Sequence, residues 1–122
     1  MAFSEFEIAR HSKELRAFIE TLRPPAPARK ELDFGFLIDG QSVELFEVRP
    51  VWNNPEQQLE RSVAKATYVK RHNHWKVYWQ RADLKWHAYE PMPSVPTLKR
   101  FLTLVEEDPH TCFWSGLGVD AC

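Results

Sequence analysis

Residues 65–90 read KATYVKRHNHWKVYWQRADLKWHAYE, and this stretch decides the fold that we expect. Tyrosine, valine and tryptophan, which favour β-strands, recur through it. Two polar segments interrupt them, Arg71–His74 and Arg81–Leu84, and each contains an Asn or Asp that tolerates the positive φ of a tight turn. The stretch therefore predicts a three-stranded antiparallel meander. Its predicted strands are Lys65–Arg71, His74–Arg81 and Leu84–Glu90.

Side chains alternate between the two faces of such a meander. Turns of two residues would fix the pairing of the strands and therefore the face on which each side chain lies. With those turns Trp79 lies opposite Trp86, and one face is almost entirely apolar. We expect this face to form the core. Its members are Ala66, Tyr68, Trp75, Val77, Trp79, Leu84, Trp86 and Ala88.

The opposite face of the meander combines cations with aromatic rings. Seven Lys and Arg lie between residues 61 and 90 against two carboxylates, a net charge of +5 in a chain whose total is −1. Lysine and arginine attract phosphates, and aromatic rings stack on bases, so the pattern predicts a surface for nucleic acid or another polyanion. An ordinary solvent-facing sheet would have a similar composition. The predicted ligand-binding residues are Arg71, His74, Lys76, Tyr78, Lys85, His87 and Tyr89.

A hairpin is expected before the meander. Leu32–Ile38 and Gln41–Val51 alternate in polarity around Asp39-Gly40, which favours a two-residue turn. That turn would place Phe36 opposite Val43, and it leaves apolar side chains on both faces. A hairpin that is apolar on both sides could supply the interface of a homodimer.

Helices are expected around these strands. Ser4 and Glu7 form a capping box for a helix over Glu5–Leu22, followed by a proline-rich connector. Asn54-Pro55-Glu56 predicts a short helix through Glu60–Ser62. Ser94 and Pro96 predict the start of a C-terminal helix, which Asp108-Pro109 ends. Cys112-Phe113-Trp114 is expected to pack as an apolar plug.

The expected fold class is therefore α+β, with a single antiparallel sheet of about five strands flanked by N- and C-terminal helices. At 122 residues the chain is predicted to be one domain. The expected divisions are an N-terminal helix (1–23), a core (32–114) and a loose tail (115–122). No apolar run is long enough to span a membrane, and the two cysteines, Cys112 and Cys122, could bridge only the tail. We expect a cytoplasmic protein.

Four residues are candidates for catalysis. Glu47 and Arg49, together with Asp33, Asp39 or Glu44, are similar to the two carboxylates and lysine of magnesium-dependent nucleases. The arginine cannot give up its proton as a lysine can, and exposed strand carboxylates are the simpler interpretation. Asp83 and His87 lie around one turn with Arg81, where Asp83 could also merely shape the turn.

No metal or cofactor is expected. His72 and His74 flank a tight turn and would not converge on one ion, and no cysteine pair has zinc spacing. Cys112 has no identifiable activating base and is expected to pack as a small hydrophobe.

Several motifs together resemble a bacterial protein family, domain of unknown function 3024 (DUF3024). They are 42–52 (SVELFEVRPVW), 63–68 (VAKATY), 75–79 (WKVYW), 83–89 (DLKWHAY) and the ending Asp108-Pro109 with Cys112-Phe113-Trp114. The resemblance covers roughly residues 32–114 and implies a small bacterial protein, but it implies no activity.

We therefore expect a binding module that is not an enzyme and that uses its basic, aromatic sheet face. The alternatives are a metal-dependent phosphodiesterase centred on Glu47 and Arg49, and a protein-interaction or homodimerisation module.

Overall fold

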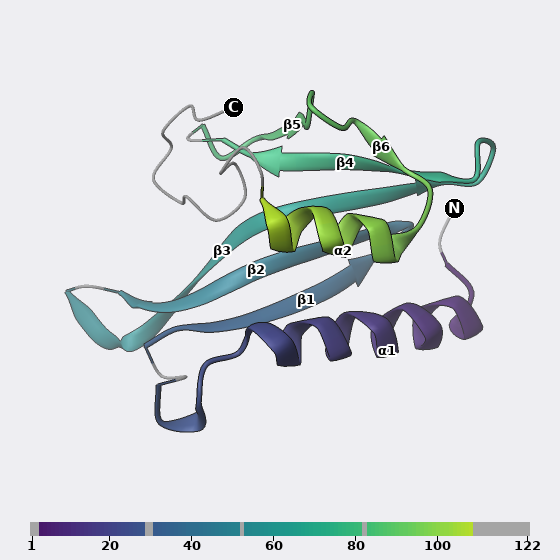
Figure 1. Ribbon diagram of the computed structural model, residues 1–122. Helices are drawn as coiled ribbons and strands as arrows, with labels where there is room; N and C mark the ends of the chain where they lie inside the picture. Colours follow the sequence, from purple (N-terminus) through teal and green to yellow (C-terminus); the bar gives the residue numbers. More distant parts are fainter. Residues whose placement is uncertain (1–2, 29–30, 52, 82, 109–122) are drawn as a thin grey trace.

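The computed structural model describes residues 3–28, 31–51, 53–81 and 83–108 (Figure 1). An antiparallel sheet of six strands in the order β1-β2-β3-β4-β5, with β6 also paired to β4, packs with two α-helices. This confirms the predicted α+β class. The elements are α1 (Glu5–Leu22), the 3-10 turn η1 (Ala26–Ala28), β1 (Asp33–Asp39), β2 (Ser42–Val51), β3 (Asn54–Val69), β4 (His74–Gln80), β5 (Trp86–Ala88), β6 (Ser94–Val95) and α2 (Leu98–Glu107).

Both helices lie on one face of the sheet, which we call the helix-covered face (Figure 1). Helix α1 runs along β1, and α2 crosses β3 and β4 and touches α1. Their apolar stripes interlock with alternate strand residues, as the helical spacing predicts. The fully buried side chains include Leu15, Val43, Leu45, Val77, Phe101 and Val105. No helix among the described residues packs on the opposite face, the helix-free face.

The start of α1 is fixed both locally and to the sheet. The capping box is confirmed: the Glu7 backbone N–H donates to Ser4 Oγ at 3.2 Å, and the Ser4 N–H donates to Glu7 Oε1 at 3.0 Å. Phe3 is buried, and its backbone N–H donates to the Gly40 carbonyl at 3.1 Å. The phenyl ring of Phe3 packs against His11 and Trp75. The first helix therefore docks on the tip of the β1–β2 hairpin.

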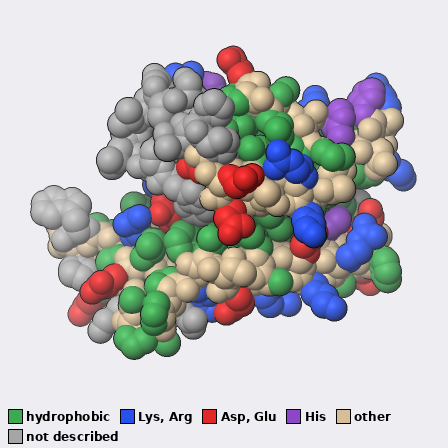
Figure 2. Space-filling model, in the orientation of Figure 1, with side chains coloured by type: hydrophobic (Ala, Val, Ile, Leu, Met, Phe, Trp, Pro, Cys, Tyr) green, Lys and Arg blue, Asp and Glu red, His purple; other side chains and the backbone are tan. Residues whose placement is uncertain are grey.

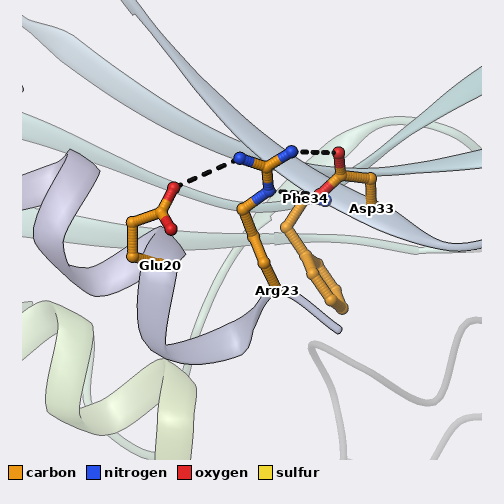
Figure 3. A network of polar contacts seen from close by, with 4 residues as sticks. All are labelled: Glu20, Arg23, Asp33 and Phe34. Atoms are coloured by element: carbon orange, nitrogen blue, oxygen red, sulfur yellow. Dashed lines mark hydrogen bonds and ion pairs between the residues drawn. The ribbon is translucent and has the colours of Figure 1, made fainter. Parts of the chain in front are cut away.

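An arginine fixes the far end of α1 (Figure 3). Arg23 donates through Nε and Nη2 to the two carboxylate oxygens of Asp33, each at 2.8 Å, and through Nη1 to Glu20 at 3.2 Å. These contacts, with Asp33 first, raise the pKa of the Arg23 guanidinium. Asp33 also accepts from the Phe34 N–H at 2.8 Å. This pair therefore joins the end of α1 directly to the first residue of β1.

The β1–β2 hairpin turns one residue later than predicted. Asp39 pairs with Ser42, so the two turn residues are Gly40 and Gln41, with φ +61° at Gly40. A positive φ at the first turn residue suits glycine and a type II′ turn. The shift changes the pairing by two residues, so Phe36 lies opposite Leu45 instead of Val43. Since two residues is the strand period, the predicted faces are retained.

The predicted short helix after Asn54 is wrong. Asn54–Val69 is the longest strand of the sheet and pairs with β2 along its length. Leu59 is the only large apolar residue between 56 and 62 and is 57% exposed, so a helix there would have no apolar stripe to bury. A β-bulge interrupts the pairing: Phe46 pairs with Ser62 and Leu45 with Ala64, which leaves Val63 as the extra residue. Val63 and Ala64 are both buried.

Helix α2 starts later than predicted. Ser94 and Val95 form β6, and Thr97 is the N-cap, its side chain accepting from the Arg100 N–H at 3.1 Å. Val95 is buried against the sheet, which favours a strand over a helical turn there. Asp108 ends the helix with φ +40°. The predicted plug at 112–114, both cysteines and the predicted tail at 115–122 lie outside the described residues.

Candidate functional site

The β3–β4 turn is longer than predicted, and this keeps the predicted faces. Val69 pairs with His74, so residues 70–73 form a four-residue loop in which Asn73 has φ +50°. Tyr68 therefore lies opposite Trp75 instead of Val77, a shift of two residues. Trp75, Val77 and Trp79 point to the helix-covered face as predicted. His74, Lys76 and Tyr78, which alternate with them, lie on the helix-free face.

The β4–β5 turn reverses the predicted faces of β5. The Leu84 N–H donates to the Arg81 carbonyl at 2.8 Å and the Arg81 N–H to the Lys85 carbonyl at 3.2 Å, with φ +63° at Leu84. These bonds enclose the three residues 82–84, where two were predicted. The pairing thus shifts by one residue, which turns every β5 side chain over.

Two predicted ligand-binding residues therefore leave the helix-free face. Tyr89 is fully buried, and its N–H donates to the Val77 carbonyl at 3.0 Å. Burial raises the pKa of the Tyr89 phenol, and the Asp108 carboxylate raises it further. His87 pairs with Trp79 on the helix-covered side, where the two rings are 6.5 Å apart. The prediction that these two side chains face outward beside Tyr78 and Lys76 is wrong, and Trp86 takes the outward position.

Two adjoining hollows on the molecular surface share His74 and Lys76, and we call them the basic hollows. The larger has a volume of about 590 Å³ at the β3–β4 turn, and the smaller, of about 350 Å³, lies where β5 gives way to β6. Neither hollow contains a carboxylate among its described lining residues. The charged, histidine and aromatic residues that line them are Tyr68, Lys70, Arg71, His72, His74, Lys76 and Tyr78.

Histidine and cationic side chains gather at the right-hand end of the molecule, where the β3–β4 turn lies (Figure 2). The imidazoles of His72 and His74 stack there, with ring centres 5.4 Å apart. Four of the predicted ligand-binding residues, Arg71, His74, Lys76 and Tyr78, are thus brought together at the basic hollows. Lys85 lies apart from them, exposed in the β4–β5 turn.

Sequence reasoning missed several residues of this surface. The Lys65 ammonium lies 5.8 Å from the ring centre of Tyr78 and 5.6 Å from that of Trp86, within cation–π range. A two-residue β4–β5 turn places Trp86 opposite Trp79 in the core, so the prediction for Trp86 is wrong together with the turn length. Lys70 and His72 lie in the β3–β4 loop, where the alternation of a strand no longer predicts the direction of a side chain. The run of charge at residues 70–72 was the available signal.

The carboxylates predicted for a metal site do not converge on Glu47. The Glu47 side chain is 3% exposed and accepts hydrogen bonds from Arg61 and, at 2.9 Å, from Arg49. Glu44 points to the opposite face of β2, and Asp33 is held by Arg23. Among the residues that the structure describes, no group of three His, Cys, Asp or Glu side chains could hold a metal ion. We call Glu47, Arg49 and Arg61 the Glu47 cluster.

Asp83 and His87 do lie together, as their spacing around one turn suggests. His87 Nε2 and Asp83 Oδ2 are 2.9 Å apart, and Asp83 Oδ1 accepts from the Lys85 N–H at 2.9 Å. The Lys85 N–H first, and then His87, lower the pKa of the Asp83 carboxyl group. The Arg81 guanidinium lies 5.4 Å from the ring centre of Trp79 nearby. Asp83 therefore shapes the turn and orients the imidazole at the same time.

Neither helix of the described chain is long and apolar enough to cross a membrane. No curated protein and no solved structure matches the chain. A family model matches residues 3–115, from the N-terminal end of α1 through α2 and beyond. As the motifs of the hairpin and meander predict, the chain belongs to the family described as domain of unknown function, DUF3024.

Proposed function

We propose that this protein is a binding module for single-stranded nucleic acid, which it contacts through the basic hollows. The observation that carries the proposal is the composition of these hollows: Lys70, Arg71 and Lys76 line them with two histidines, and no described lining residue is a carboxylate. Cations that have no carboxylate beside them remain available to phosphates, whose neutralisation releases counterions and drives binding.

Aromatic rings next to the cations favour nucleic acid over a simple anion. Tyr78 is partly exposed and lines the smaller hollow, and Trp86 lies on the same face beyond Lys65. Rings of this kind stack on unpaired bases and contribute about 1–3 kcal/mol per base. The helix-free face supplies the surface along which a strand of several nucleotides could lie.

The test is the binding of a fluorescein-labelled 12-nucleotide oligo(dT) measured by anisotropy across salt concentrations. We expect affinity to fall linearly on logarithmic axes, with a slope of about −0.7 per phosphate contacted. Inorganic polyphosphate of similar charge serves as a competitor without bases. Absence of binding at low salt, or binding that does not depend on salt, would disprove the proposal. Competition by polyphosphate at equal charge concentration would show a general polyanion surface without stacking.

A second copy of the chain is an alternative partner, favoured by a separate observation. Leu37, Phe46 and Val48 form an apolar strip on the helix-free side of the β1–β2 hairpin, and Leu37 is 41% exposed. The Phe46 ring covers Gly35 so closely that a Cβ there would lie 2.6 Å from its Cζ atom. Light scattering tests this alternative: a dimer that Leu37→Lys dissociates supports it, and a monomer at all concentrations excludes it.

A further inference from the structure

A groove with chemistry unlike that of the basic hollows lies on the helix-covered side. It has a volume of about 730 Å³ and lies between α1, the β3–β4 turn and the first turn of α2. Its volume lies within the range of about 300–1,000 Å³ that is typical of small-molecule sites. Tyr68 and Trp75 give it an aromatic wall, and Leu98 adds an aliphatic one.

The groove is lined by a histidine that has an unsatisfied nitrogen. His11 is only 6% exposed, and its ring lies 4.8 Å from Phe3 and 5.2 Å from Trp75 between ring centres. Its Nδ1 atom is buried and has no hydrogen-bond partner among the described residues. Because buried polar atoms are nearly always hydrogen-bonded, His11 Nδ1 is an unusual polar atom beside the aromatic wall of the groove.

The first turn of α2 brings a positive end to the same groove. Thr97 caps the helix by accepting from the Arg100 N–H, so the N–H groups of Leu98 and Lys99 precede the first intrahelical acceptors. Both of these residues line the groove, as does Thr97 itself. The free N–H groups and the helix dipole favour an anionic group at this position.

The charged side chains around the groove also favour an anion. Arg10, Lys13 and Lys99 line it against two carboxylates. One of these, Glu7, accepts the Ser4 N–H in the capping box, and this engagement lowers its pKa. Glu14 is the remaining carboxylate. Three cations against two carboxylates leave a small excess of positive charge beside the helix N-terminus and the aromatic wall.

From this juxtaposition we propose that the groove binds a small aromatic carboxylate. The carboxylate accepts from the N–H groups at the start of α2 and pairs with Lys99. The ring of the ligand lies against Tyr68 and Leu98, with its edge toward His11. This site shares Tyr68 with the larger basic hollow, but none of its cations lines the basic hollows, so the two sites can be tested separately through their cations.

The experiment uses ¹⁵N-labelled protein titrated with indole-3-acetate and with indole-3-acetamide, its neutral analogue of the same shape. We expect indole-3-acetate to shift the amide signals of Thr97, Leu98, Lys99, Tyr68 and Trp75. It should bind about fivefold more tightly than indole-3-acetamide, because only its carboxylate gains from the helix N-terminus and from one cation. The ring ¹⁵N signals of His11 are expected to move with the same titration curve.

Two matched variants separate this site from the nucleic-acid surface. Lys99→Gln is expected to weaken acetate binding about threefold, to leave the acetamide unchanged and to leave oligonucleotide binding unchanged. Lys76→Gln is expected to weaken oligonucleotide binding and to leave the binding of indole-3-acetate and of indole-3-acetamide unchanged. Equal affinity for acetate and acetamide, shifts confined to the basic hollows, or acetate binding that Lys99→Gln leaves unchanged would each overturn the proposal, whatever the outcome with oligonucleotides.

Discussion

Two groups of cations along β3 and its neighbours differ in what they face. In the Glu47 cluster, Arg49 and Arg61 both pair with one buried carboxylate, which compensates part of their positive charge. Lys70, Arg71 and Lys76 line the basic hollows, whose described lining residues include no carboxylate. The number of cations is similar in the two regions, and the buried acid makes the difference. The first arrangement places its cations in an ion pair with a buried acid, and the second is the arrangement that we propose for binding a ligand.

The largest effect is expected where the buried acid is neutralised. Glu47→Gln leaves Arg49 and Arg61 without a counter-charge, and we expect the free energy of unfolding to fall by about 2 kcal/mol in urea denaturation. That is below the full cost of breaking a buried pair, because Arg49 is 54% exposed and remains hydrated. Oligonucleotide binding is expected to stay unchanged. Glu60→Gln, on the neighbouring strand β3 and exposed, is the control and should change stability by less than about 0.5 kcal/mol.

The opposite result is expected in the basic hollows. Arg71→Gln combined with Lys76→Gln should leave the free energy of unfolding within about 0.5 kcal/mol of the unmodified protein. Binding of the oligonucleotide should weaken by about tenfold at low salt, and the salt slope should become shallower by about 1.4. Arg16→Gln, an exposed cation on α1, is the control. An equal loss of binding with Arg16→Gln would show that only net charge matters.

His11 provides a third case, a buried titratable ring that belongs to neither the Glu47 cluster nor the basic hollows. Burial lowers the pKa of His11 below its usual 6.5, Arg10 lowers it further, and Glu7 opposes them. The unfolded chain therefore binds more protons, and the free energy of unfolding falls as the pH drops below 6.5, with a slope of at most about 1.4 kcal/mol per pH unit. Well above pH 6.5 His11 is neutral in both the folded and the unfolded chain, so its titration no longer changes the free energy of unfolding.

His11→Phe keeps a ring of similar shape and removes the titration. The measurement is the difference in the free energy of unfolding between the two proteins from pH 7.5 to 5. We expect the unmodified protein to lose stability relative to the variant over this range. A difference that is independent of pH would contradict the assignment.

The smallest effect is expected from the ring of Tyr78. Tyr78→Leu retains an apolar side chain and removes the stacking surface, and should weaken oligonucleotide binding by about 1 kcal/mol with the salt slope unchanged. Tyr78→Phe keeps the ring and is expected to bind as the unmodified protein does. If both variants bind alike, the basic hollows attract phosphates without reading bases.

The faces of the sheet were predictable only where an error in the position or length of a turn left the strand parity intact. The β1–β2 and β3–β4 pairings both differ from the predicted ones by two residues, so core residues such as Val43 and Trp75 point inward as expected. The β4–β5 loop differs by one residue, which exchanged Trp86 and Tyr89 between the faces. Both alternating sets of β5 contain an aromatic residue, so composition alone could not choose between them.

The start of β3 was missed for a different reason. Asn54-Pro55-Glu56 is typical of a helix start, but such local signals are weak compared with a long pairing partner. Strand β2 extends to Val51 and pairs with β3 as far as Asn54. Alternation in residues 56–62 is poor because most of their side chains are exposed. The candidate site was predicted in part, since four of its residues follow from β4 and its turn, and the rest depend on loop geometry.

The bulge at Val63 makes the length of β3 as important as its composition. Without the extra residue, the register that pairs Leu45 with Ala64 would continue along β3. It would bring Arg61 opposite Val48, on the face away from Glu47. A single-residue deletion or insertion in residues 62–64 would thus exchange the faces of the whole N-terminal half of this strand. We expect the lineage of this protein to tolerate length changes in its loops but to preserve residue count at this position, even where the side chains vary.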